Sequence, residues 1–347
     1  MLPLSVLEKA RAELLDYQGL GMSVMEISHR SSAFDELAER TEACLRRLLS
    51  ISDDYAILFL AGGATMQFAQ VPLNLASPDR QGAYIVNGSW SKKAFSIAQR
   101  MGFARLAASS EDTGFKSIPS TDEWNLGGNP AYLHYASNET ISGVQFRQPP
   151  ETDLPLVSDM SSDILSRPLD IEKFGVIYAG AQKNIGQAGL AVVIVRKDLL
   201  QDLPDNLPDL QSWKIQEKQG SRLNTPPTYA WYIAGLVFEW VEAMGGVERM
   251  AQLNQQKSDT LYQYLDQSSF YVNEIPSQYR SHMNIPFQIV DESLHGQFVA
   301  EAEAAGLSSL KGHRSVGGMR ASIYNAMPIE GIRALLSFMK EFERKAG

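Results

Sequence analysis

The sequence has few of the features that mark membrane, secreted or nucleic-acid-binding proteins. Its unbroken apolar stretches are short, such as the eight residues 188–195, whereas a membrane-spanning helix needs about 20. The single cysteine, Cys44, cannot form an internal disulfide, and the formal net charge of −9 provides no basic surface for binding phosphates. The first fifteen residues lack a basic head and carry Glu8 and Glu13, so they indicate an amphipathic helix rather than a signal peptide. We therefore expect a soluble cytoplasmic protein that binds neither membranes nor nucleic acid.

Short apolar runs alternate with amphipathic stretches over the first two thirds of the chain, as in parallel α/β sheets. The run at 55–60 ends in glycines and precedes a helical stretch at 66–75. The run at 82–86 is followed by a turn at 87–89 and a helical stretch at 90–101. Later strands are expected at 132–136, 154–159, 174–178 and 190–195, and a proline-rich surface loop at 202–208.

Beyond residue 226 long helical periodicity prevails, and Gly245-Gly246 divides two such stretches. The tail then alternates expected strands at 283–289 and 319–321 with expected helices at 294–305 and 330–345. These patterns predict an α/β fold with a large domain, built on a mostly parallel mixed sheet flanked by helices, and a smaller α+β C-terminal domain. The expected division is an N-terminal segment 1–15 that packs with the small domain, a large domain 16–245 and a small domain 246–347.

Lys183 and Asp159 stand out because each follows an apolar run that reads as a buried strand. A lysine in this setting can form a Schiff base with a carbonyl group, and the alternative is an ordinary loop lysine. A carboxylate at the carboxyl end of a strand lies where open α/β sheets bind ligands, and the alternative is a helix cap. Together the pair suits pyridoxal phosphate, which needs a lysine imine and an acid partner for its pyridine nitrogen.

Two helix starts add candidates for cofactor binding. Residues 62–65, Gly-Gly-Ala-Thr, would present backbone N–H groups and a hydroxyl to a phosphate, although they match neither GxGxxG nor GxxxxGK[ST]. Trp90 begins the second helix, where it is either a core aromatic or a flat surface for stacking on a planar cofactor.

Histidine–arginine pairs occur twice, as His29-Arg30 and His313-Arg314, with Arg320 six residues further on. In an acidic protein, arginines among glycine and serine suggest recognition of anions, because the guanidinium fork matches carboxylate and phosphate. Ordinary surface ion pairs are the alternative. Both pairs fall outside the main strands and could face one cleft from two domains.

Eight segments, in order from about residue 20 to 331, carry a family resemblance: SHRSS, FLAGGATMQFAQVPLNL, NGSWSKKA, SNETISG, SDMSSD, GAQKNIGQAG, LNTPPT and GHRSVGGMRASIYNAMPIEG. Together they resemble the phosphoserine aminotransferases, which are class V, fold-type I enzymes dependent on pyridoxal phosphate. The resemblance implies transamination between O-phospho-L-serine and 2-oxoglutarate, giving 3-phosphohydroxypyruvate and L-glutamate, in serine biosynthesis. It also makes 4-phosphohydroxy-L-threonine of pyridoxine biosynthesis a second candidate substrate.

The resemblance implies a role for each matching residue. Lys183 would be the Schiff-base lysine, Asp159 the partner of the pyridine nitrogen, Trp90 the stacking ring and Thr140 a hydrogen-bond partner beside the ring. Some family members have glycine-arginine where this chain has Ala-Thr, so backbone and hydroxyl donors would replace an arginine at the phosphate. The implied phosphate contacts are Ala64, Thr65 and Gln182, joined by Asn224 and Thr225 from the second subunit of a homodimer.

The resemblance also implies which residues bind the anionic groups of the substrate, and it implies no metal site. Arg30 matches the family's substrate arginine, Arg320 its α-carboxylate arginine, and His29, His313 and Arg314 its pocket for the anionic side chain.

Four alternative functions are weighed against this one. Class V aminotransferases of the serine–glyoxylate type need no pocket for a dianion. Cysteine desulfurases need a mobile cysteine, whereas Cys44 falls on a helix face. A Rossmann dehydrogenase would carry GxGxxG, and a non-catalytic module would have no use for the lysine, aspartate and tryptophan in this register.

Overall fold

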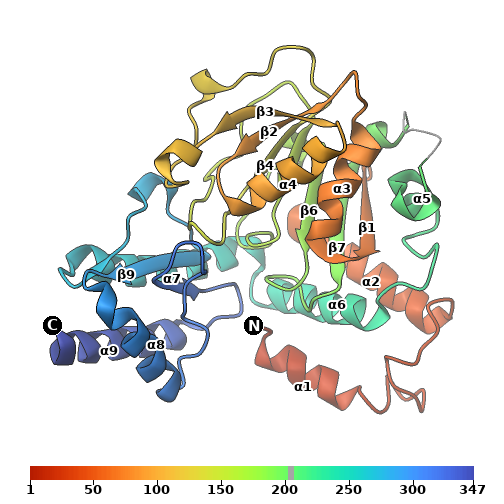
Figure 1. Cartoon of the computed structure of the whole chain (residues 1–347). Helices are drawn as coiled ribbons and strands as arrows, with labels where there is room; N and C mark the ends of the chain where they lie inside the picture. The colour runs from red at the N-terminus through yellow and green to blue at the C-terminus, as the bar shows by residue number, and fades with distance from the viewer. Residues whose placement is uncertain (202–206) are drawn as a thin grey trace.

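The structure is a computed structural model that describes residues 1–201 and 207–347 (Figure 1). Within these ranges the chain forms a seven-stranded sheet and a three-stranded sheet, each with its own helices. Most of the loop expected at 202–208 lies outside the described residues. None of the described helices is long and apolar enough to cross a membrane.

The large sheet has the strand order β1-β7-β6-β5-β4-β2-β3. Strands β6, β5, β4, β2 and β3 pair in parallel, whereas β7 is antiparallel to both of its neighbours. The sheet is therefore mixed and mostly parallel, as predicted. Strand β3 was missed because its sequence, ARLAAS, has no β-branched residue to signal a strand. The bounds are β1 (Tyr55–Ala61), β2 (Gly82–Val86), β3 (Ala104–Ser109), β4 (Leu133–Ala136), β5 (Leu156–Asp159), β6 (Val176–Gly180) and β7 (Leu190–Arg196).

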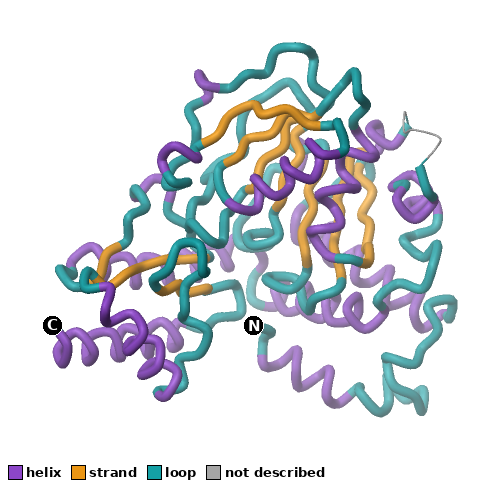
Figure 2. The backbone as a smooth tube through the Cα atoms, viewed as in Figure 1, coloured by secondary structure: helices purple, strands orange, loops and turns teal. Residues whose placement is uncertain are grey.

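Helices cover both faces of this sheet, because alternate residues of its strands point to opposite sides (Figure 2). In β1, Leu58 belongs to the core under α3 and α4, whereas Phe59 belongs to the core under α2 and α6. On the second face, Trp231 of α6 stacks on Phe59 with 4.3 Å between ring centroids. The bounds are α2 (Ser32–Leu49), α3 (Gly63–Leu75), α4 (Ser89–Arg100), α5 (Trp213–Lys218) and α6 (Thr228–Ala243).

The C-terminal part has a hydrophobic core of its own around an antiparallel sheet of order β10-β9-β8. Its elements follow the alternation that the sequence predicts, with the addition of the two-residue strand β8. The division at 245/246 stays our proposal. Gly245 there separates α6 from α7. The bounds are α7 (Gly246–Gln267), β8 (Tyr271–Val272), β9 (Asn284–Ile289), α8 (His295–Ala304), β10 (Met319–Ser322) and α9 (Ile329–Ala346).

The N-terminal helix α1 (Leu4–Ala12) packs against α6. Lys9 pairs with Glu239 at 3.7 Å, and the Tyr232 hydroxyl donates to the Glu13 carboxylate. The chain start is near the small part as well, because Met1 lines a pocket together with Asn325, which follows β10.

Trp231 provides a test of the packing between α6 and the sheet. We expect Trp231→Ala to lower the free energy of unfolding by about 3–5 kcal/mol, because it leaves a cavity against Phe59 and Phe34. Trp231→Phe should lower it by less than half as much. It keeps a ring and removes an indole N–H that has no partner among the described residues. Urea-unfolding midpoints would measure both changes, and equal losses would contradict the packing argument.

Candidate active site

The predicted site residues gather at the carboxyl edge of the large sheet. Asp159 is the last residue of β5, Thr140 follows β4, Lys183 follows β6, and Trp90 is the second residue of α4, the helix after β2. Parallel strands end at the same edge, so four segments that are far apart in the sequence converge there.

Asp159 is held as a buried carboxylate. Its side chain accepts two hydrogen bonds at Oδ1, from Ser161 N at 2.9 Å and from Ser161 Oγ at 2.6 Å. The Ser161 hydroxyl in turn accepts from Gly180 N at 3.0 Å, so its own proton is directed at Asp159. Burial raises the pKa of Asp159, and the charge of Lys183 and the bonds from Ser161 oppose that rise. The bond to Ser161 N is the capping geometry that the sequence left open, and it occupies Oδ1 alone.

Lys183 lies opposite the Trp90 ring, with 5.6 Å between Nζ and the ring centroid. Burial lowers the pKa of Lys183, while the negative charges of Asp159 and Glu139 raise it. A lysine whose pKa is lowered presents more of the neutral amine, which is the form that accepts protons and attacks carbonyl carbons.

Trp90 and Arg320 are linked through Thr140. The indole Nε1 donates to Thr140 Oγ1 at 2.8 Å, and Arg320 Nη1 donates to the Thr140 backbone oxygen at 3.0 Å. Arg320 lies on β10, so this bond connects the small sheet to the site. The buried Arg320 Nε has no hydrogen-bond partner within the described residues. It is a donor that an anionic ligand would satisfy.

A phosphate fits at the start of α3. Gly62 and Gly63 have φ of 102° and 66°, a left-handed conformation that glycine adopts without strain and that turns the chain from β1 directly into the helix. The helix begins at Gly63, so Ala64 and Thr65 lie in its first turn; the expected start near residue 66 was wrong. No described side chain caps this turn, which leaves its N–H groups for an anion.

Gln182 belongs to the same corner of the site. A Cβ on Gly180, the last residue of β6, would lie 2.8 Å from Gln182 Oε1 and 3.2 Å from Ala64 N. The glycine therefore lets the end of β6 approach both groups. Together with the Asp159 carboxylate and the Trp90 ring, these donors fit pyridoxal phosphate, which has a phosphate, a ring nitrogen and a flat ring. The described residues contain no cluster of three His, Cys, Asp or Glu that could hold a metal ion.

The other predicted residues are not brought to Lys183 by any contact described within this single chain. They are at least partly exposed in three loops, which precede α2, α6 and β10. The pairs keep mostly local contacts: Arg30 Nε lies 3.4 Å from His29 Nε2, and His313 Nδ1 lies 2.7 Å from Ser315 Oγ. Their roles stay predictions; the residues are His29, Arg30, Asn224, Thr225, His313 and Arg314.

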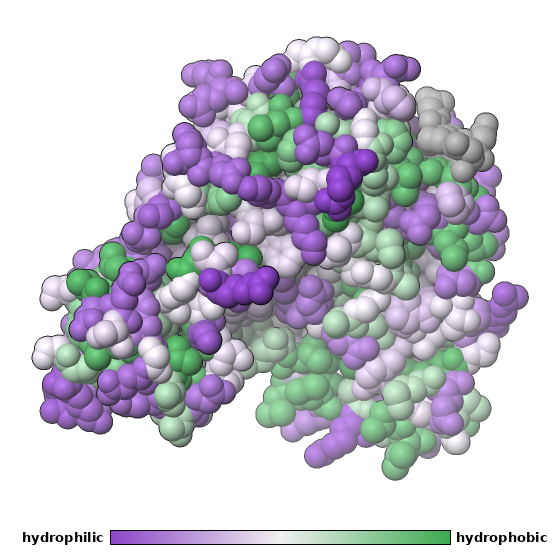
Figure 3. All heavy atoms as spheres, viewed as in Figure 1, coloured by the Kyte–Doolittle hydropathy of each residue, from purple (hydrophilic) through white to green (hydrophobic). Residues whose placement is uncertain are grey.

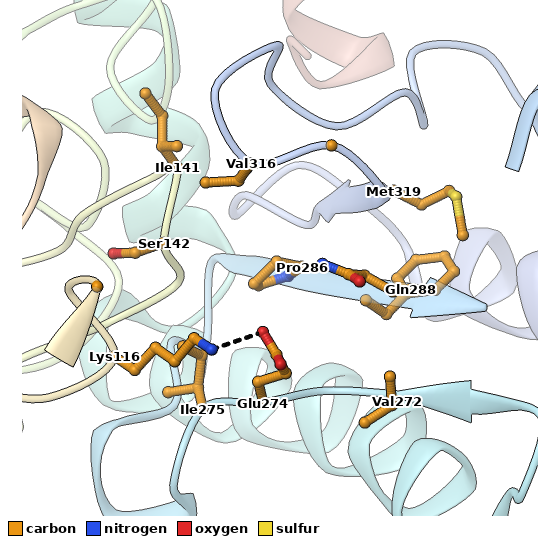
Figure 4. Close-up of a pocket in the computed structure, with 13 residues that line it drawn as sticks. Lys116, Ile141, Ser142, Val272, Glu274, Ile275, Pro286, Gln288, Val316 and Met319 are labelled. Atoms are coloured by element: carbon orange, nitrogen blue, oxygen red, sulfur yellow. Dashed lines mark ion pairs between the residues drawn. The ribbon is translucent and has the colours of Figure 1, made fainter. Parts of the chain in front are cut away.

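The loop that carries His313 and Arg314 approaches the site from the small sheet. It continues into Val316, which lines a pocket facing Ile141 (Figure 4). Because Ile141 directly follows Thr140, the loop lies beside the segment that carries the site. An ion pair of 2.9 Å between Lys116 and Glu274 lies at the same pocket.

Three polar residues at the site escaped sequence analysis: Glu139, Ser161 and Asn184. The Asn184 amide donates to the backbone oxygens of Ser162 and Ile164, and its Oδ1 accepts from Asn325 N at 3.0 Å. It thus ties the neighbour of Lys183 both to the turn after Asp159 and to the small part of the chain. The motifs SNETISG, SDMSSD and GAQKNIGQAG contain all three residues, but a motif does not reveal hydrogen-bond partners.

Comparisons with known proteins agree on one family. The family model "Aminotransferase class-V" matches residues 1–335. The chain is 54% identical to the phosphoserine aminotransferase of Pseudomonas putida, over 100% of this chain and 96% of that protein. Two solved structures are close. The phosphoserine aminotransferase of Bacillus circulans subsp. alkalophilus has a TM-score of 0.98 and 46% identity, covering 100% of this chain and 97% of that one. The PLP-bound enzyme of Trichomonas vaginalis has a TM-score of 0.93 and 40% identity, covering 98% and 97%.

The electrostatic coupling of Asp159 to Lys183 can be tested in the cofactor-free protein. Asp159→Asn removes a negative charge that favours the protonated amine, so we expect the pKa of Lys183 to fall below its wild-type value. The midpoint pH for modification of Lys183 by an amine-directed reagent, followed by peptide mass spectrometry, should shift downward. Asp198→Asn is the matched control, because Asp198 is exposed and pairs with Arg196 at the opposite edge of the sheet. An unchanged midpoint in Asp159→Asn would contradict the coupling.

Proposed function

Because the chain belongs to the class-V aminotransferase family and, within it, to the phosphoserine aminotransferases, we propose that it transfers the amino group between O-phospho-L-serine and 2-oxoglutarate, with pyridoxal phosphate as its cofactor. The products are 3-phosphohydroxypyruvate and L-glutamate. The observation that carries the proposal is the grouping of Lys183, Asp159 and Trp90 at one edge of the sheet. The fold is that of the fold-type I enzymes, which the solved relatives share.

When bound, pyridoxal phosphate supplies an aldehyde that takes up amino groups and a ring that accepts electrons from the substrate Cα. Asp159 would hold the ring nitrogen through the oxygen that Ser161 leaves free, and Trp90 and Thr140 would hold the ring plane. The first turn of α3 and Gln182 would hold the phosphate. Asn224 and Thr225 of the partner subunit would add two donors to it.

Lys183 is the residue we assign to proton transfer at Cα. Its partly desolvated amine has a lowered pKa, so more of it is in the neutral form that can accept the Cα proton. Once protonated, Lys183 Nζ can also donate this proton to a second atom of the reacting molecule. No other residue is then needed for the transfer. The two hydrogen bonds that Ser161 donates favour the charged form of Asp159 and oppose the rise in pKa that burial causes.

Arg320 would bind the substrate α-carboxylate through its unpartnered Nε. The phosphate of phosphoserine and the side-chain carboxylate of glutamate occupy the same position relative to the amino group, so one cationic pocket can serve both. Arg30, with His29, His313 and Arg314, would form it.

Glyoxylate-type aminotransferases of the same class need no such pocket, and assays with serine and glyoxylate separate the two functions. 4-Phosphohydroxy-L-threonine shares the phosphate and the amino acid groups and is the further substrate to assay.

A homodimer is the assembly we propose. Large apolar side chains are exposed along α1 and the segment after it, and Figure 3 shows an apolar surface below the large sheet where α1 lies in Figure 1. A second copy would remove these side chains from water. They are Leu4, Leu7, Leu15, Leu20, Met22 and Met25.

The reducing cytoplasm is the location we propose, because the one cysteine is a buried thiol. Cys44 lies inside α2, and burial raises its pKa to about 11. Such a thiol is a poor nucleophile, which also supports the choice of an aminotransferase over a desulfurase.

Lys183→Ala tests the central assignment. We expect the purified wild-type protein to absorb in the visible range, to lose that band when L-glutamate is added and to regain it with 3-phosphohydroxypyruvate. The variant should still bind the cofactor without a covalent bond but show no turnover, because it lacks the amine that we assign to proton transfer. Lys173→Ala is the control, since Lys173 is exposed beyond the opposite end of β6. Turnover by Lys183→Ala without added amine would refute the assignment, and a wild-type protein that takes up no pyridoxal phosphate would refute the function.

Arg30→Ala tests the anion pocket. Losing a guanidinium that contacts a phosphate should lower kcat/KM for phosphoserine by about 100-fold, whereas L-alanine, which has no side-chain anion, should lose far less. Steady-state kinetics with both amino acids would measure the ratio. Arg333→Ala provides the control, because Arg333 is two-thirds exposed on α9. Equal and small losses for both substrates would remove Arg30 from the pocket.

A further inference from the structure

Glu139 is a second buried carboxylate at the site, and the roles assigned so far do not use it. It follows β4 and is fully buried. Its Oε1 accepts from Ser91 N at 2.7 Å and from Ser91 Oγ at 2.8 Å, and its Oε2 accepts from Trp90 N at 3.0 Å. Burial raises the pKa of Glu139, and these donors oppose the rise. Both oxygens are therefore engaged as acceptors.

All three of these donors belong to the first turn of α4. A helix start has N–H groups without internal partners, which a nearby side chain usually accepts. Here the residue before the helix is Gly88, which has no side chain to do so. Glu139 takes that role from 49 residues away, and its negative charge suits the positive end of the helix. A Cβ on Gly88 would collide with the Glu139 side chain, so glycine is required for the carboxylate to reach the helix.

The same segment fixes the ring of Trp90 at its other end. Glu139 holds the Trp90 backbone N–H, and the next residue, Thr140, accepts from the indole Nε1 at 2.8 Å. Two successive residues thus fix both the backbone position of Trp90 and the orientation of its ring. The ring centroid lies 5.6 Å from Lys183 Nζ, so this orientation sets the width of the space between the indole and the amine.

We propose that Glu139 is a positioning residue for the reaction, an inference that rests on the proposed function: its carboxylate anchors the first turn of α4 and thereby holds the Trp90 indole in place across from Lys183. Glu139 does not act as an acid or base itself. Both oxygens of its carboxylate accept hydrogen bonds from α4, so they are engaged in holding that helix.

The first experiment measures cofactor binding by Glu139→Gln. The amide keeps the size of the side chain but turns an NH₂ group toward a backbone N–H, so one bond to α4 is lost. We expect the affinity of the cofactor-free protein for pyridoxal phosphate to fall about ten-fold, as for a buried donor left unpaired. The visible circular dichroism of the bound cofactor should change as well, because it reports the orientation of the ring. Glu343→Gln is the matched control: its partly buried carboxylate also accepts side-chain hydrogen bonds, in the small part of the chain.

A double-mutant cycle separates positioning from general stabilisation. If Glu139 acts through Trp90, Glu139→Gln should have little further effect on pyridoxal phosphate affinity in a Trp90→Ala background. The same ten-fold loss in both backgrounds would overturn the proposal, as would an unchanged affinity and circular dichroism in Glu139→Gln alone. Should Glu139→Gln fail to fold, Ser91→Ala is the second variant: it removes the hydroxyl donor to Glu139, which is also the acceptor for the Asn87 and Gly88 N–H groups, and keeps both N–H donors to the carboxylate. Its loss of affinity should likewise disappear in the Trp90→Ala background.

These measurements use pyridoxal phosphate alone and need no phosphoserine. A wild-type protein that binds the cofactor but does not convert phosphoserine would refute the proposed substrate, while the cycle would still decide the role of Glu139. An active wild-type enzyme whose cycle shows no coupling would refute the positioning role only. A wild-type protein that binds no pyridoxal phosphate would refute both.

Discussion

The parallel pairing of β2, β4, β5 and β6 is the constraint on which the site depends. Parallel strands end at one edge, so the residues that follow them meet there although they are distant in sequence. The edge supplies a carboxylate from β5, an amine after β6, a polar segment after β4 and an aromatic ring after β2. The antiparallel strand β7 has its carboxyl end at the opposite edge of the sheet. Because β7 pairs antiparallel with both β6 and β1, β1 runs parallel to β6, and the glycine turn from β1 into α3 lies at the same edge as the site.

Burial of charge at this edge is possible because backbone N–H groups and hydroxyls surround each carboxylate. Asp159 accepts hydrogen bonds from Ser161, whose hydroxyl is itself oriented by the Gly180 N–H group. Glu139 accepts hydrogen bonds from the first turn of α4. These donors oppose the rise in pKa that burial imposes on both acids. The ammonium of Lys183 experiences the reverse balance, in which burial lowers its pKa and the two carboxylates limit the fall. The reactivity of the amine is thus set jointly by three strands.

Local patterns in the sequence were enough to predict most elements and the position of the site. Apolar runs followed by glycine located the strand ends, and the strand ends located Asp159 and Lys183. What failed were features without a local signal: β3 lacks β-branched residues, and α3 begins three residues earlier than its apolar periodicity suggests. Glu139, Ser161 and Asn184 act through partners that only the fold brings together, such as Asn184 with Asn325. Within the described residues, the polar contacts of His29, Arg30 and His313 are local ones, so neither the sequence nor these contacts show how the two loops meet a substrate.

The segment Glu139-Thr140 has a consequence for how the protein can change over time. The Glu139 carboxylate holds the helix that carries Trp90, the Thr140 hydroxyl accepts from the indole, and the Thr140 backbone oxygen accepts from Arg320. A substitution there would disturb the cofactor-facing ring and the carboxylate-binding arginine at once, so selection on one trait cannot act independently of the other. The exposed His29-Arg30 and His313-Arg314 loops carry no such double role. A new preference for the substrate's side chain should therefore arise more readily by substitution in these loops than in Glu139-Thr140.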